Sequence, residues 1–155
     1  MKTNRSSHDT DTVNPIPEGF HTVTPYLIVS NAQGLLDFIV DGLGGKVEFA
    51  MKQDDGKISH ATAKIGDSII MISDLMKDTK PTNSMLYLYV EDVDKLYARA
   101  LKVKGAKATR EVKDEFYGDR SGCITDPWGN NWWIATHVEN VSDADLEKRK
   151  SQAVK

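Results

Sequence analysis

The 155-residue sequence predicts an α+β protein made of two βαβββ modules. Strand-like and helix-like patterns follow one another in the order β-α-β-β-β, and this order occurs twice. The landmarks repeat as well, because Val29-Ser30-Asn31 corresponds to Val90-Glu91-Asp92 at a separation of about 61 residues. Gly44 and Gly105, which end the two predicted helices, have the same separation. Each half of the chain is therefore predicted to be one structural unit.

The first unit contains four strand patterns and one helix pattern. Residues 21–30 are rich in β-branched side chains and alternate in polarity, which indicates a strand. Asn31 is a suitable N-cap for a helix over 32–43, where large apolar residues recur at helical spacing. The remaining strands are predicted over 46–53, 57–65 and 68–73, with turns at Asp54-Asp55-Gly56 and Gly66-Asp67 between them.

The second unit repeats this order. A strand is predicted over 84–90, and Asp92 is expected to cap a helix that carries apolar residues from Val93 to Val103. The Asp126–Gly129 turn has proline at its second position and glycine at its fourth, which suits a type I turn. Three further strands are predicted over 106–112, 120–125 and 131–137.

The two ends differ from the central domain, which we place at residues 16–140, with modules at 21–74 and 83–137. Residues 1–15 are polar and have no periodic apolar pattern, so we expect a disordered arm. They also lack the apolar stretch of a secretory signal. Residues 141–155 are predicted to form a short helix and tail, because Ser142 and Asp145 form a capping pair.

Composition excludes several classes of protein. The net charge is −3 and no basic block is present, which argues against a nucleic-acid partner. No apolar run approaches the roughly 20 residues that a membrane span requires, so we expect no membrane partner. Cys123 is the only cysteine, which rules out an internal disulfide and a cysteine-rich zinc site. We therefore expect a cytoplasmic protein.

Three segments carry a resemblance to a known family. They are TPYLIVSNAQGLLDF near the start, HATAKIGDSIIMISD in the middle and GDRSGCITDPWGNNWWIATHVEN at the end. Over roughly residues 18–140, the sequence resembles the glyoxalase/bleomycin-resistance/extradiol-dioxygenase group, the vicinal oxygen chelate superfamily, and within it the PhnB-like branch. The resemblance implies two βαβββ modules whose sheets curl around a shared cavity, and a homodimer.

The resemblance also implies where a metal would bind. Enzymes of the family take His, Gln or Glu ligands from the first and last strands of each module. Carried over one position at a time, these ligand positions fall at Thr24, Ile70, Met85 and Trp133. These four side chains do not provide the nitrogen and oxygen donors of a divalent-metal site, so we expect no metal and no cofactor.

Strand alternation then distinguishes the two adjacent tryptophans. If Trp133 occupies a ligand position it points into the cavity, and Trp132 points toward the helices. The same alternation points Tyr26, Tyr87 and Tyr89 inward. Aromatic side chains with polar edges are typical of a pocket for a flat organic molecule. The alternative is an interior that these side chains fill themselves, without a cavity.

Two polar residues complete the candidate ligand-binding set of Tyr26, His60, Tyr87, Tyr89, Arg120 and Trp133. His60 lies on the third predicted strand and is a weak candidate for an acid or base, or a hydrogen-bonded residue at the rim. Arg120 forms a local ion pair with Asp119 or reaches an anionic group on a ligand. His21 and His137 are expected to have no special role.

Three functions remain open at this stage. The first is a metal-free small-molecule binding protein, which needs an aromatic slot and no acid/base groups. The second is a metal-dependent lyase or dioxygenase of the same superfamily, with a displaced metal site around His60. The third is a structural dimer without a ligand. Metal content separates the first two hypotheses, and the presence of a cavity separates the first from the third.

Overall fold

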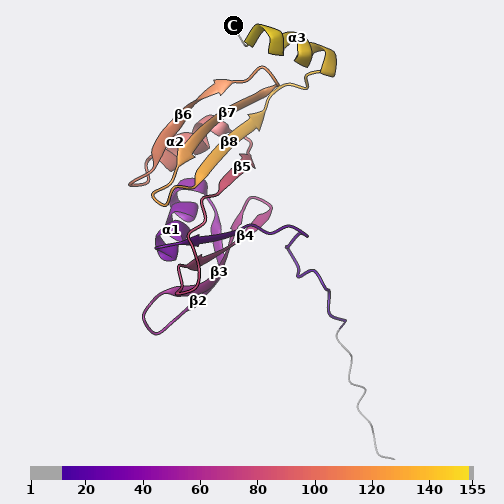
Figure 1. Cartoon of the computed structure of the whole chain (residues 1–155). Helices are drawn as coiled ribbons and strands as arrows, with labels where there is room; N and C mark the ends of the chain where they lie inside the picture. The colour runs from indigo at the N-terminus through magenta and orange to yellow at the C-terminus, as the bar shows by residue number, and fades with distance from the viewer. Residues whose placement is uncertain (1–11, 154–155) are drawn as a thin grey trace, which may run out of the picture.

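The computed structural model of the chain describes residues 12–153. Most of the arm expected over residues 1–15 therefore lies outside the described residues. Two four-stranded sheets, each with one helix, form the predicted pair of βαβββ modules, and a third helix follows them (Figure 1). Across residues 12–153, none of the helices combines the length and the apolar character needed to cross a membrane.

The first module has the strand order β1-β4-β3-β2. Its parts are β1 (Tyr26–Val29), α1 (Ala32–Leu43), β2 (Lys46–Lys52), β3 (Ile58–Ile65) and β4 (Ser68–Asp74). The first strand begins at Tyr26 rather than at residue 21. Thr24, one of the implied metal-ligand positions, therefore lies before the strand. The Asn31 side chain accepts a hydrogen bond from the Gly34 amide and caps α1, as predicted. Gly44 ends the helix in the left-handed conformation, with φ of 68°.

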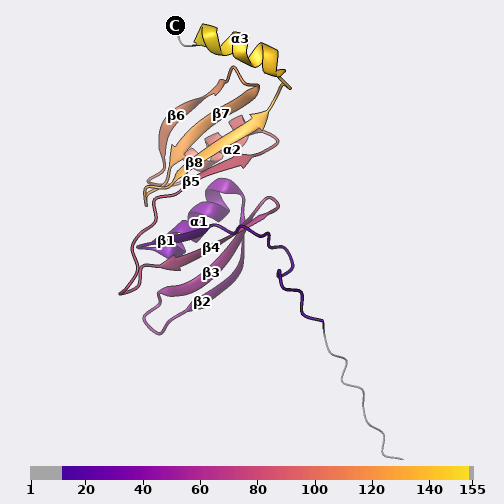
Figure 2. The same cartoon turned by 45° about the vertical axis from the view of Figure 1, so that its right-hand side comes forward.

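The second module has the equivalent order β5-β8-β7-β6. Its parts are β5 (Met85–Tyr89), α2 (Val93–Leu101), β6 (Lys107–Asp114), β7 (Asp119–Thr125) and β8 (Asn131–His137). The parallel β5–β8 pair places Tyr87 opposite Trp133, as β1 and β4 place Tyr26 opposite Met71. The helix α3 (Asp143–Ala153) lies beyond the second sheet, at the far end of the molecule from the first module (Figures 1 and 2).

Each sheet packs one face on the helices and leaves the other open. Side chains facing α1 and α2 are buried, among them Leu27, Ile72, Ile124, Trp132 and Ile134. We call the opposite face of each sheet its open face. The alternation predicted for the two tryptophans is confirmed, because Trp132 is fully buried in the core and Trp133 lies on the open face.

The two modules meet through their helices and through a few side chains. α1 contacts α2, whereas no strand of one sheet contacts a strand of the other. Phe38 of α1 packs against Trp132 of β8, with the ring centroids 5.9 Å apart. Arg99 of α2 donates hydrogen bonds to the carbonyl oxygens of Val40 and Asp41 at the end of α1, at 3.0 and 2.7 Å. Packing and a charged cap therefore both fix the relative placement of the modules.

Candidate functional site

The open face of the second sheet carries an aromatic group. The rings of Tyr87 and Trp133 lie within 6° of parallel, with centroids 6.1 Å apart. Tyr89 lies next to Tyr87, with centroids 5.2 Å apart. The Arg110 guanidinium of β6 stands over the Trp133 ring, with Cζ 5.2 Å from the ring centroid, and also pairs with Glu115 at 2.6 Å. The face therefore combines stacked aromatic rings with a cationic side chain.

Asp119 at the start of β7 organises the polar end of this face. Its Oδ2 atom accepts hydrogen bonds from the Tyr89 hydroxyl at 2.9 Å and the Tyr87 hydroxyl at 3.2 Å. Its Oδ1 atom lies 2.8 Å from Nδ1 of His137, and Nε2 of His137 lies 2.8 Å from Oδ1 of Asn140. Asp119 is buried, so these partners replace the water that a carboxylate requires.

The charges of this cluster follow from its contacts. Burial acts to raise the pKa of Asp119, but the hydrogen bonds from His137, Tyr89 and Tyr87 together outweigh burial and lower it. The hydrogen bond to Asp119 and then the one to Asn140 raise the pKa of His137. Burial raises the pKa of Tyr87 well above its usual range, and the bond to Asp119 raises that of Tyr89. The cluster therefore favours an ionised carboxylate, a protonated imidazole and two neutral phenols.

The open face of the first sheet is mostly apolar. The Tyr26 hydroxyl lies 3.2 Å from Nδ1 of His60, and their rings are 5.7 Å apart. Phe49 also lies near His60, with the two ring centroids 6.4 Å apart. Phe49 and Met51 are 48% and 53% exposed, which is high for such large apolar side chains. No carboxylate bonds to His60 among the described residues, so this face has no counterpart of Asp119.

The candidate residues therefore divide between two faces. Tyr26 and His60 belong to the first sheet, and Tyr87, Tyr89 and Trp133 belong to the second. Within the described chain, no strand of the first sheet lies beside a strand of the second. A groove of about 1290 Å³ lies between the modules along β5. Tyr87 and Tyr89 line this groove, together with Ile70, Leu86 and His137, whereas Tyr26, His60 and Trp133 do not.

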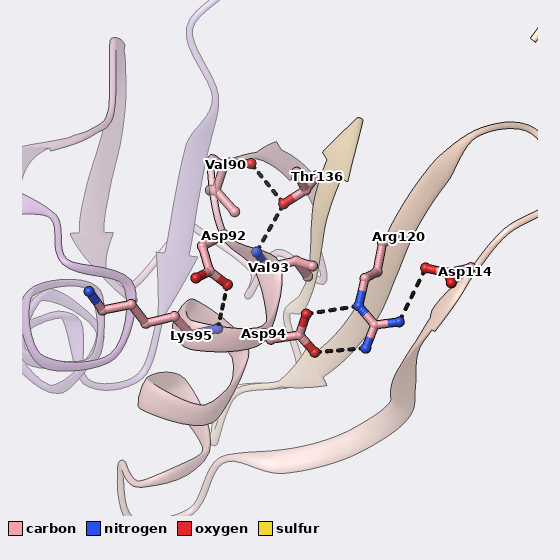
Figure 3. Close-up of polar contacts among 8 residues, drawn as sticks. All are labelled: Val90, Asp92, Val93, Asp94, Lys95, Asp114, Arg120 and Thr136. Carbon is pink, nitrogen blue, oxygen red and sulfur yellow. Dashed lines mark hydrogen bonds and ion pairs between the residues drawn. The ribbon is translucent and has the colours of Figure 1, made fainter. Parts of the chain in front are cut away.

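Arg120 lies on the opposite side of the second sheet from Trp133. Its guanidinium bonds both carboxylate oxygens of Asp94 on α2 at 2.8 Å, and one oxygen of Asp114 at 3.2 Å (Figure 3). The expected ion pair with Asp119 is absent, because neighbouring residues of a strand point to opposite faces. Arg120 ties β7 to α2 and β6, and the structure does not bring it to the aromatic surface.

The four positions implied for a metal also need one correction. Ile70 is buried among the core residues on the helix side of β4, so the open-face position of that strand, opposite Tyr26, is Met71. The alignment to the first module was one residue out of register. With Met71 in place of Ile70, the set still lacks nitrogen and oxygen donors suited to a divalent ion. Residues 12–153 contain no cluster of three or more His, Cys, Asp or Glu side chains that fits a metal ion.

Sequence reasoning missed three residues of the second open face: Arg110, Asp119 and His137. Two of them, Asp119 and His137, could have been found from the pairing register of the β7–β8 hairpin. Counting outward from the Asp126–Gly129 turn places Cys123 opposite Trp133 and Asp119 opposite His137. Arg110 could not be placed in this way, because the β6–β7 pairing shifts register on both sides of it.

Comparison with known proteins agrees with this architecture. The model of the Glyoxalase/Bleomycin resistance protein/Dioxygenase superfamily matches residues 19–134. That match covers most of the chain and takes in both modules, so the protein belongs to this superfamily. The match defines the family and its fold, and does not by itself define a ligand or a reaction.

A curated relative matches most of the chain, and solved structures have the same fold. The uncharacterized protein Rv0887c of Mycobacterium tuberculosis strain H37Rv is 29% identical over 154 residues, covering 92% of this chain and 88% of its own length. TioX from Micromonospora sp. ML1 has a TM-score of 0.64 at 21% identity, covering 75% of this chain and 98% of its own. A PhnB protein from Bacillus cereus has a TM-score of 0.62 at 15% identity, covering 75% and 99%.

Proposed function

We propose that this protein binds a small, flat organic molecule on the aromatic open face of its second module, without a metal ion. The observation that carries the proposal is the near-parallel pair of Tyr87 and Trp133, with Arg110 over the tryptophan ring. Stacked aromatic pairs contribute about 0.5–1.5 kcal/mol beyond the area that they bury. A third flat ring that joins this stack would gain the same kind of contact.

The apolar open face of the first module supports a homodimer. Its exposed Phe49 and Met51 would be shielded if the first module of one chain covered the second module of another. Such pairing would bring Tyr26 and His60 toward Tyr87 and Trp133, which one chain alone leaves apart. We propose this arrangement for the binding-competent protein. Sedimentation at micromolar concentration is expected to give twice the chain mass of 17.3 kDa, and a monomer alone would contradict it.

We also assign the chain to the PhnB-like branch of the superfamily. The support is the combination of Gly118-Asp119-Arg120 with the Asp126–Gly129 turn that precedes the double tryptophan. In this chain Asp119 organises the polar cluster of the open face, and Asp126 bonds the indole Nε1 of Trp132 at 2.9 Å.

Tryptophan fluorescence tests the binding proposal. Titration with planar aromatic compounds is expected to quench the emission of the wild-type protein. In a Trp133→Phe variant, the quenching should be weaker, while Trp128 and Trp132 still report on the fold. Equal quenching in both proteins would place the ligand elsewhere. Elemental analysis of the same preparation is expected to show no stoichiometric metal, and one metal ion per chain would favour the lyase or dioxygenase hypothesis.

A further inference from the structure

The hydroxyl groups of Tyr87 and Tyr89 are held in one orientation. Both donate their single proton to Oδ2 of Asp119, which is buried and hydrogen-bonded by His137 as well. A phenolic oxygen that has donated its proton can still accept a hydrogen bond. The two side chains are 41% and 65% exposed, so a ligand can contact them. This edge of the aromatic surface therefore presents hydrogen-bond acceptors.

The two nearby cationic side chains already have acceptor partners. His137 contacts Asp119 with one ring nitrogen and Asn140 with the other. Arg110 is paired with Glu115 at 2.6 Å. Each of these two cationic side chains is thus matched by a carboxylate, and the tyrosine oxygen atoms remain as acceptors for a ligand that carries N–H or O–H groups.

We propose that the second open face selects planar aromatic molecules that carry N–H or O–H donors at the ring edge, with the oxygen atoms of Tyr87 and Tyr89 as the acceptors. This inference rests on the proposed function, because it assumes that the ligand stacks near Trp133. It adds the chemical class of the ligand. Asp119 acts as a positioning residue, since it sets the direction of both hydroxyl protons.

Two dyes with one ring system test this selectivity. Proflavine is a planar cation with two amino groups at its edge, and acridine orange is the same ring with both amines dimethylated. Their affinities for the purified full-length protein can be measured by fluorescence titration at pH 7. We expect proflavine to bind about fivefold more tightly, which is the effect of one net hydrogen bond in water. The Tyr87→Phe/Tyr89→Phe double variant should bind the two dyes equally, with the affinity for acridine orange unchanged.

Single and control variants keep the test decisive. If the double variant fails to fold, Tyr89→Phe alone should halve the preference or more, because Tyr89 is the more exposed of the pair. Tyr97→Phe removes a hydroxyl that bonds the Arg110 carbonyl from the helix side, and should leave the preference intact. Equal binding of both dyes to the wild type, or a preference that survives the double variant, would overturn the inference but leave aromatic binding standing. Failure of both dyes to bind would overturn both proposals.

Discussion

The two open faces have the same strand order and parallel register but very different chemistry. The first presents Phe49 and Met51 to solvent, and its one side-chain hydrogen bond between aromatic residues joins Tyr26 to His60. The second fixes its tyrosines through a buried carboxylate with three partners. The comparison shows that the repeated fold sets where side chains point, while single residues decide whether a face is ordered for recognition or left as an apolar surface.

Two of the buried carboxylates, one in each module, have different roles. In the first module, Asp74 accepts hydrogen bonds from the backbone amides of Ala32 and Ile58, at 2.9 and 2.7 Å, and thereby holds the start of α1 to β3. In the second, Asp119 accepts from side chains on the open face. One carboxylate organises the backbone and the other organises a surface. Variants of both residues can separate stability from recognition.

The largest effect is expected at Trp132. Its ring is fully buried, packs on Phe38 of the other module and donates to Asp126. Trp132→Ala should reduce the free energy of unfolding by about 3–5 kcal/mol, because it loses apolar contacts and leaves a cavity. Trp133→Ala should have a smaller effect, because that ring is partly exposed. Denaturation midpoints of the two variants measure the difference, and a larger loss for Trp133 would contradict the assignment of faces.

The next effect compares the buried carboxylates Asp74 and Asp119. Asp119→Ala should destabilise the protein by about 1–3 kcal/mol, because it leaves the donors of His137 and two tyrosines without their acceptor. Asp74→Ala should cost a similar amount, because it leaves two buried backbone amides without an acceptor. Only Asp119→Ala should change the dye preference. Urea denaturation combined with dye titration separates the two variants, and a loss of preference in Asp74→Ala would contradict the comparison.

The pH dependence should be specific to the second module. Asp119 raises the pKa of His137 in the folded state, so the pair stabilises the protein fully below the unfolded value of about 6.5. This contribution is lost as the pH rises through the folded-state pKa. NMR titration should therefore find the His137 midpoint above the usual value, and Asp119→Asn should lower it. An unchanged midpoint in Asp119→Asn would show that the contact does not form in solution.

The smallest effect is expected at Arg120. Its ion pairs with Asp94 and Asp114 are partly exposed, and such pairs contribute little to stability in water. The hydrogen bond from Arg120 lowers the pKa of Asp94, so salt or acid should weaken the contact. Arg120→Ala should lower the melting temperature slightly and leave dye binding unchanged. Weaker dye binding in this variant would show that Arg120 contributes to the ligand site. That result would contradict its position on the helix side of the sheet.

The sequence alone determined the two-module fold, most helix and strand positions, and the division of Trp132 from Trp133. These features follow from local patterns: alternation within a strand, helical spacing, capping residues and a repeat. The assignment of Ile70 failed because a register error of one residue exchanges the two faces of a strand.

Only the tertiary structure decided that the open face of the second module is the one held by a buried carboxylate. Asp119, Tyr87, Tyr89 and His137 come from three strands, and only the sheet brings their polar atoms within hydrogen-bonding distance. Arg110 reaches Trp133 across a strand pair whose register shifts on either side of it. Local sequence patterns do not specify such contacts, because they depend on strand pairing and side-chain reach between residues far apart in the chain.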